Sequence, residues 1–310
     1  MLSRRNIRIK ILQALYMMGR DSSVDSEGAL TFYRERLEDS RDLYLFNLFN
    51  LIRTTEYAVE DTERKHTKYL PSEEDKKFSA KLYENKSIQA LLREQNLQET
   101  FLKKDMESLV EEDNLRKYYK GFAKTDAYRK YILNDNGDAG DRKILLELYK
   151  YLNKEDLYTE TMDDHFATWE DDKSLIVGAM KKTIKSLPDM PELYRTFRPD
   201  YEASVEFGEN LLSIVSKDGE SFEKLIEPAL ENWDLDRVAN IDMIFLKMAL
   251  CEFLHFPTIP TKVTLNEYVE LAKLYSTDKS KEFVNGILDK LLNDLNEKKM
   301  IEKTGRGLDE

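Results

Sequence analysis

The stretch from residue 236 to residue 295 constrains the fold of this chain more than any other part of its sequence. Its first segment, residues 237–254, repeats apolar side chains at intervals of three and four, which places them on one face of an α-helix. Pro257 and Pro260 end this segment, because proline lacks the amide hydrogen and disfavours helix in the residue before it. Two more segments with helical spacing follow before residue 295. We therefore predict three packed amphipathic helices in an all-α protein.

Two local signals refine this prediction. The second helix is expected to open at Thr264, because Thr264 and Glu267 have the Thr-x-x-Glu spacing of a capping box. The third helix contains Gly286, and a glycine inside a helix costs up to ~1 kcal/mol relative to alanine. We therefore expect another part of the chain to pass close to the backbone of Gly286.

The same stretch carries a family resemblance. Residues 259–275 read Ile-Pro-Thr-Lys-Val-Thr-Leu-Asn-Glu-Tyr-Val-Glu-Leu-Ala-Lys-Leu-Tyr, and residues 280–290 read Ser-Lys-Glu-Phe-Val-Asn-Gly-Ile-Leu-Asp-Lys. Together they resemble the C-terminal half of the NusB transcription antitermination family, over about residues 199–297. The family's Arg-rich first helix is matched near the start of the chain by Arg4, Arg5, Arg8, Gln13, Leu15 and Tyr16.

The resemblance implies a NusB-like helical bundle and a function without catalysis or cofactor. It implies an RNA-binding transcription antitermination factor that binds single-stranded, boxA-like RNA of ribosomal RNA transcripts. The implied protein partners are the ribosomal protein NusE and the RNA polymerase antitermination complex. A competing interpretation is a protein-binding scaffold that has kept the NusB fold but not RNA binding, and an enzyme is a distant third.

The first 20 residues contain no Asp or Glu, although the protein as a whole is acidic. Apolar residues in this segment fall on one helical face, with Ser3 as the expected N-cap and Gly19 as the expected C-cap. Arginine binds phosphate bidentately and stacks on bases, so the basic start of this helix is a candidate RNA contact. A solvated helix face is the alternative interpretation.

Chemistry and resemblance together select a small set of candidate site residues. Tyr16 and Phe283 are candidates for stacking on bases, each with core packing as the alternative. Asp242 matches an acidic family position and is a candidate for partner binding. The predicted RNA-binding set is Arg4, Arg5, Arg8, Tyr16, Lys279 and Phe283.

Charge and composition limit the other possibilities. The 310 residues carry a formal net charge of −12, so an RNA site has to be a local basic patch on an acidic body. The single cysteine, Cys251, cannot form an internal disulfide, which fits a reducing cytoplasm. There is no apolar run of ~20 residues to span a membrane, and the first 18 residues lack the features of a signal peptide.

The remaining length is assigned to an insertion. We predict an Arg-rich helix at 1–20, a helical insertion at 21–198 that includes part of the family's second helix, a NusB-like domain at 199–297, and a frayed, charged tail at 298–310. A long helical pattern begins at residue 30 and is expected to break near Ser40. The role of the insertion, an internal duplication within it, and the oligomeric state, including a homodimer, stay open.

Motifs that would indicate an enzyme or a metal site are missing from the sequence. It has no Gly-x-Gly-x-x-Gly, no phosphate-binding Gly-Lys-Ser/Thr and no Gly-x-Ser-x-Gly. The acidic cluster at 134–141 resembles a calcium loop in spacing but lacks the required glutamate, so a capping loop is expected there.

Overall fold

The computed structural model describes residues 3–134, 137–199, 201–230 and 238–308, and in this part of the chain every regular element is a helix. The predicted all-α class is therefore confirmed. The chain forms two compact units, one of residues 38–198 and one that combines the residues up to 37 with those from 199 onward. We call them the insertion unit and the terminal unit. Residues 21–37 thus lie with the terminal unit, and the assignment of 21–198 as an insertion stays a prediction.

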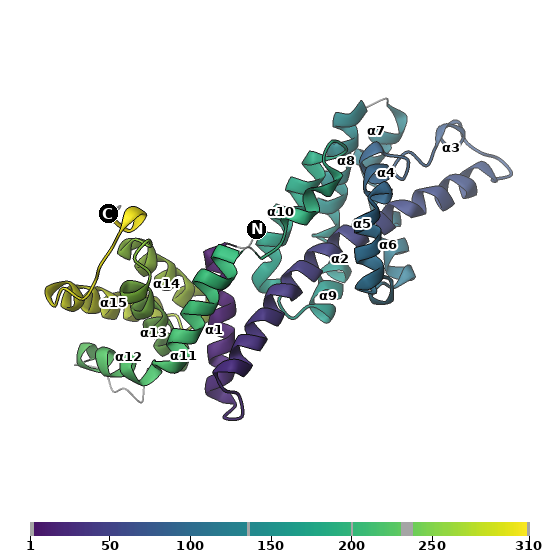
Figure 1. The fold of residues 1–310 in the computed structure, drawn as a ribbon. Helices are drawn as coiled ribbons and strands as arrows, with labels where there is room; N and C mark the ends of the chain where they lie inside the picture. Colours follow the sequence, from purple (N-terminus) through teal and green to yellow (C-terminus); the bar gives the residue numbers. More distant parts are fainter. Residues whose placement is uncertain (1–2, 135–136, 200, 231–237, 309–310) are drawn as a thin grey trace. The chain divides into compact units, whose positions relative to one another are not determined.

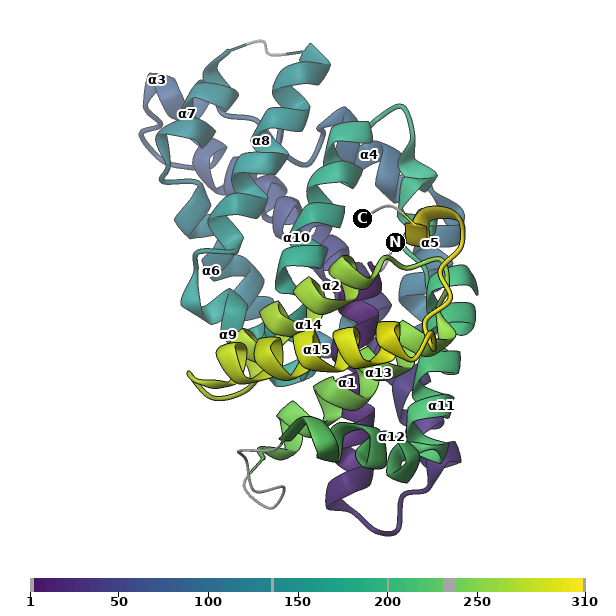
Figure 2. The ribbon, with the colours of Figure 1, turned by 90° about the vertical axis from the view of Figure 1, so that its left-hand side faces the viewer.

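The terminal unit is arranged around α13 (Figure 2). α13 is buried along most of its length and packs against α1, α11, α12, α14 and α15. Its elements are α1 (Arg4–Arg20), the first turns of α2 (Ser26–His66), the π-helix η3 (Glu202–Glu209), α11 (Asn210–Lys217), α12 (Gly219–Ile226), η4 (Glu227–Leu230), α13 (Asn240–His255), α14 (Thr261–Tyr275), α15 (Ser280–Glu297) and η6 (Gly305–Leu308).

Local predictions for these helices had mixed outcomes. Ser3 does cap α1, because its side chain accepts a hydrogen bond from the amide of Asn6. Gly19 does not end α1, which continues to Arg20. The capping box at Thr264 is wrong, because α14 already begins at Thr261 and the Thr264 hydroxyl donates to Glu252 instead, at 3.1 Å. The expected close approach at Gly286 is also wrong, since the space beside its backbone is open.

The tail beyond α15 is not frayed over its described part. Lys303 donates hydrogen bonds from Nζ to the carbonyl oxygens of Glu252 and Phe256, at 3.1 and 3.0 Å. The amide of Thr304 donates to the carbonyl oxygen of Pro257 at 3.0 Å. These three hydrogen bonds hold the described part of the tail against the last turn of α13 and the residues that follow it.

The insertion unit is assembled on α2, which forms one continuous helix of 41 residues (Figure 1). The other elements are α3 (Glu73–Lys77), α4 (Lys86–Arg93), α5 (Gln95–Lys103), η1 (Met106–Leu109), α6 (Glu112–Phe122), α7 (Asp126–Leu133), α8 (Gly137–Leu152), α9 (Asp156–His165), α10 (Trp169–Ser186) and η2 (Pro191–Thr196). The predicted break near Ser40 is wrong. Ser40 is buried and its hydroxyl donates to Asp172 at 2.6 Å, so a tertiary partner satisfies it inside the helix.

A buried polar network ties α2 to two later helices of the insertion unit. The Asn47 side-chain oxygen accepts hydrogen bonds from the hydroxyls of Tyr149 on α8 and Tyr158 on α9, at 3.0 and 2.8 Å. Around this network lies a continuous cluster of buried apolar side chains that extends from Leu43 to Phe197. The insertion unit therefore has a hydrophobic core of its own.

Candidate nucleic-acid interface

The predicted arginine cluster on α1 does not form one surface. Arg8 lies inside the terminal unit, where its guanidinium donates two hydrogen bonds to the carboxylate of Glu252, at 2.7 and 2.8 Å. The Arg8 side chain is 3% exposed and that of Glu252 is 0% exposed. Burial opposes the charge on Arg8, but the attraction and hydrogen bonds of Glu252 prevail and raise the pKa of Arg8 above its ordinary value.

Further contacts hold this pair in place. The hydroxyls of Tyr268 and Thr264 donate to Glu252, at 2.6 and 3.1 Å, and the Arg8 guanidinium also lies over the rings of Tyr268 and Phe207. The carboxylate is thus satisfied by donors from two helices, α1 and α14. The prediction that Arg8 binds RNA needs correction, because a guanidinium buried to this degree and paired with Glu252 is out of reach of a phosphate in solution.

Arg4 and Arg5 remain at the surface. Their side chains are 41% and 40% exposed, and each approaches one carboxylate: Arg4 lies 3.2 Å from Glu202, and Arg5 lies 4.0 Å from Glu267. Ion pairs with this exposure contribute little to stability, so both guanidinium groups can exchange these partners for a phosphate.

The middle of α1 separates Arg4 and Arg5 from Tyr16. Every residue from Ile7 to Leu12 is buried, so the exposed parts of the helix are its two ends. At 1.5 Å per residue, the Cα atoms of Arg4 and Tyr16 lie roughly 18 Å apart along the axis. The arginines and the tyrosine predicted as one site therefore stand at opposite ends of α1.

The end of α1 that carries Tyr16 borders a pocket of about 270 Å³ within the terminal unit. Tyr16 is 39% exposed, and the guanidinium of Arg20, one helical turn later, lies 5.9 Å from the centre of its ring. Asn240, at the start of α13, and Lys247 also line the pocket. Two cations line the pocket, Arg20 and Lys247. Lys247 donates a hydrogen bond to Glu223, whereas Arg20 has no carboxylate partner among the described residues.

Lys279 and Phe283 belong to the same end of the terminal unit. The hydroxyl of Ser280, the first residue of α15, donates to Asp242 in the first turn of α13 at 2.7 Å. This bond holds the start of α15 beside the start of α13, whose Asn240 lines the pocket. Lys279 is exposed and Phe283 is half-buried.

Asp242 itself is 4% exposed, and the prediction that it faces a partner needs correction. Its acidic side chain joins two helix ends through Ser280, which is a structural role. In contrast, Arg20 and Lys247 line the pocket but were not predicted from the sequence. Arg20 had a visible signal, because it follows Tyr16 by four residues and so shares its helix face. Lys247 had none, since only tertiary packing brings it to the pocket.

The described residues contain no group of three or more His, Cys, Asp or Glu side chains placed to hold a metal ion. Within the same part of the chain, none of the helices has the length and apolar content that a membrane crossing requires.

Comparison with known proteins agrees with this architecture. Residues 194–293 match the model of the NusB family, a range that takes in α11 to most of α15. The chain contains a NusB-family domain. The match does not include α1 or most of the insertion unit, so the NusB-family domain makes up about a third of the protein.

The similarity to individual NusB proteins likewise covers only about a third of this chain or less. The chain is similar to the transcription antitermination protein NusB of Salinibacter ruber, with 43% identity over 103 residues, 33% of this chain and 64% of the relative. For NusB of Chloroherpeton thalassium the identity is 49% over 25% of this chain and 37% of the relative, and for NusB of Natranaerobius thermophilus 42% over 29% and 66%. The chain thus spans less than two thirds of these relatives. No solved structure matches it.

Proposed function

We propose that this protein is an RNA-binding transcription antitermination factor that acts with the ribosomal protein NusE on boxA-like RNA, without catalysis. The observation that carries the proposal is the NusB-family domain at residues 194–293. The similar proteins named above are transcription antitermination proteins. An acidic body suits the partnership, because ribosomal proteins are usually basic and opposite charges steer association.

The proposed RNA surface is the end of the terminal unit that carries Tyr16, Arg20, Lys279 and Phe283. Tyr16 offers an exposed ring for a base, and Arg20 and Lys279 offer charges for phosphates. Arg4 and Arg5 are proposed as a separate phosphate contact at the other end of α1. Arg8 and Asp242 are left out because both are buried.

The test is a titration of labelled boxA-type RNA at two salt concentrations, with and without NusE from the same organism. Salt-sensitive binding that NusE strengthens supports the proposal. The paired variants Tyr16→Ala with Arg20→Gln, and Arg4→Ala with Arg5→Ala, then show which end of α1 contacts the RNA. The surface proposed here predicts the larger loss for the first pair.

A second candidate is a protein-binding scaffold without RNA contact. It is favoured by the pairing of Arg4, Arg5 and Arg8 with carboxylates of the protein itself. NusE binding with no measurable RNA affinity at low salt would support the scaffold and reject the RNA-binding function.

A further inference from the structure

The insertion unit concentrates positive charge on α6, α7 and the joint between them. Residues 116–130 contain six Lys or Arg and a single Asp, in a chain whose net charge is −12. Five of the six are exposed and have no carboxylate at ion-pair distance among the described residues: Lys117, Lys120, Lys124, Arg129 and Lys130. Unpaired like charges repel one another, so this surface favours the binding of a polyanion.

These cations follow one another along two consecutive helices and the joint between them. Lys117 and Lys120 are three residues apart on α6 and therefore share a helix face, and Lys124 lies in the joint just after the end of α6 at Phe122. Arg129 is on α7. The cations thus form a row along two consecutive helices.

This row borders a pocket of about 280 Å³ within the insertion unit. Its lining combines aromatic and aliphatic walls with cations, from Phe78, Tyr128, Ile132, Lys65, Lys124 and Arg129. A second pocket of similar size lies between α2 and α6, and its lining is Tyr57, Glu60, Asp61, Arg64, Arg116, Tyr119 and Lys120. Asp61 and Glu60 pair with Arg64 and Arg116, so Lys120 is the cation of this pocket without a carboxylate partner among the described residues. Apolar walls beside cations suit a base and its phosphate.

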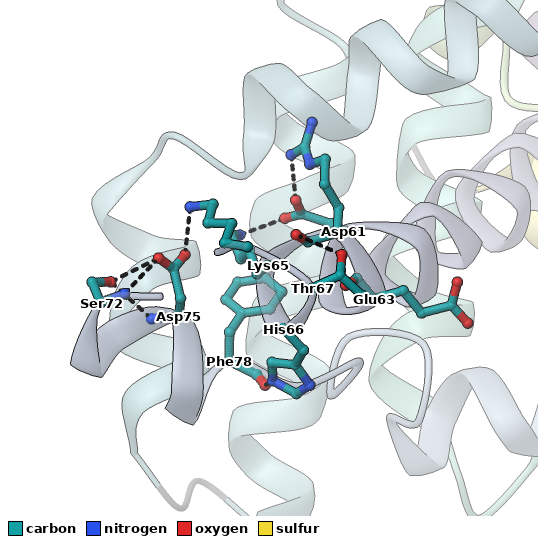
Figure 3. Close-up of polar contacts among 10 residues, drawn as sticks. Asp61, Glu63, Lys65, His66, Thr67, Ser72, Asp75 and Phe78 are labelled. Carbon is teal, nitrogen blue, oxygen red and sulfur yellow. Dashed lines mark hydrogen bonds and ion pairs between the residues drawn. The ribbon is translucent and has the colours of Figure 1, made fainter. Parts of the chain in front are cut away.

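Lys65, Asp75 and Phe78 line one side of the first pocket, and Figure 3 shows the polar contacts that hold Lys65 and Asp75 in place. The ammonium group of Lys65 lies 3.3 Å from the centre of the Phe78 ring and is paired with Asp61. The Asp75 carboxylate accepts hydrogen bonds from the amide and the hydroxyl of Ser72. It also forms an ion pair with Lys68, whose Nζ lies 2.8 Å from Oδ1 of Asp75. Lys65 and Lys68 are therefore neutralised, and Lys124 and Arg129 are the pocket cations left for a ligand.

An exposed aromatic side chain is close in sequence to residues that contact this pocket. Tyr69, in the loop between α2 and α3, is 97% exposed, and it directly follows the Lys68 that pairs with the pocket residue Asp75. A ring with this exposure contributes nothing to the core, whereas a base can stack on it.

We propose that this basic face, defined as Lys117, Lys120, Lys124, Arg129 and Tyr69, is a second RNA-binding surface, which holds single-stranded RNA without sequence preference. The phosphates follow the row of cations, one base stacks on Tyr69, and a base occupies the pocket beside Phe78. The proposal goes beyond the function proposed for the NusB-family domain and does not require a boxA sequence.

The experiment uses the full chain and a fluorescein-labelled oligouridylate of about 30 nucleotides, which has no boxA sequence and is longer than one compact domain covers. Dissociation constants are measured over a series of salt concentrations. The test variant is Lys120→Gln, Lys124→Gln and Arg129→Gln together. The matched control is Lys181→Gln, Lys182→Gln and Lys185→Gln on α10, three exposed cations of the same unit that line neither pocket. Both are also made in the Tyr16→Ala, Arg20→Gln background, which disrupts the surface proposed for boxA RNA.

The proposal predicts that the test variant lowers the slope of log affinity against log salt by about 2, because each phosphate contact on a single strand contributes ~0.7. The control variant leaves the slope unchanged, and Tyr69→Ala weakens binding roughly tenfold. The effect persists in the Tyr16→Ala, Arg20→Gln background, so it is separable from any failure of the boxA site.

Three results would overturn the proposal. An unchanged slope in the test variant removes RNA from this face. An equal loss in the α10 control shows attraction by diffuse charge and no site. A test variant that loses binding to vesicles containing phosphatidylserine, or to an acidic protein, while keeping its RNA affinity assigns the face to that other partner.

Discussion

Arg8 on α1 and Glu252 on α13 are joined by two parallel hydrogen bonds, although 244 positions separate them in the chain. Both side chains are shielded from solvent, and the bonds connect the first helix to the central helix of the NusB-family domain. One of the three arginines that the sequence predicted to bind RNA thus serves the interior of the fold.

Removal of either partner is expected to destabilise the protein strongly. Arg8→Ala leaves the Glu252 carboxylate buried and unpaired, which costs about 3–5 kcal/mol of the free energy of unfolding. Urea unfolding measures this loss. Arg5→Ala on the same helix is the control, with an expected change of no more than about 1 kcal/mol. A small loss for Arg8→Ala, comparable to the control, would mean that Glu252 finds another partner. The double variant Arg8→Met with Glu252→Leu should lose less than either single change.

Two glycines are expected to respond in opposite directions to alanine. A Cβ at Gly208 in η3 would collide with the hydroxyl of Tyr33 and with Ile7, so Gly208→Ala destabilises the terminal unit. Gly286 lies in α15 with open space beside it, so Gly286→Ala stabilises by up to ~1 kcal/mol through helix propensity. Thermal unfolding of both variants measures the difference. A destabilised Gly286→Ala would show that an unseen partner approaches that helix face.

The capping box at the start of α3 is expected to depend on pH. The hydrogen bond from Lys68 and those from Ser72 lower the pKa of Asp75 from 3.8 to about 2. Because the folded value lies below the unfolded one, this stabilisation is complete above about pH 4 and is lost as the pH falls through about 2. NMR titration of the Asp75 carboxyl group measures the midpoint. Lys68→Met should raise it toward 3.8, and an Asp75 that already titrates near 3.8 in the unmodified protein would contradict the prediction.

The docked tail is expected to contribute to the stability of the terminal unit. Lys303→Met removes both hydrogen bonds to the last carbonyl groups of α13, which costs about 1–3 kcal/mol. Burial lowers the pKa of Lys303, so its charge is already disfavoured at this position and the loss is expected toward the lower end. Urea unfolding is again the measurement. Lys298→Met, at an exposed lysine nearby, should change stability by less than about 0.5 kcal/mol, and equal effects would show that the tail bonds are absent in solution.

Features that depend on neighbours in sequence were predictable. The three- and four-residue spacing correctly indicated the three C-terminal helices, and Ser3 was recognised as a cap because its partner, Asn6, lies three residues away. Cys251, which belongs to the predicted helix 237–254, is buried in α13. The signals at Thr264 and Gly286 misled, because both were interpreted without the tertiary environment.

The helical class and the NusB-family domain could be predicted from the amino-acid sequence alone, because helix periodicity and the two long family motifs are properties of contiguous residues. Which charged residues are available to a ligand depends on how the helices pack in three dimensions. Arg5 and Arg8 are three residues apart on one helix, yet Arg5 is half-exposed and Arg8 is enclosed with Glu252. The same holds for Lys124 and Arg129, whose shared pocket with Phe78 exists because separate helices pack together. The free energy of a charged side chain depends on its burial and on its partner, and both are set by segments that are distant in sequence.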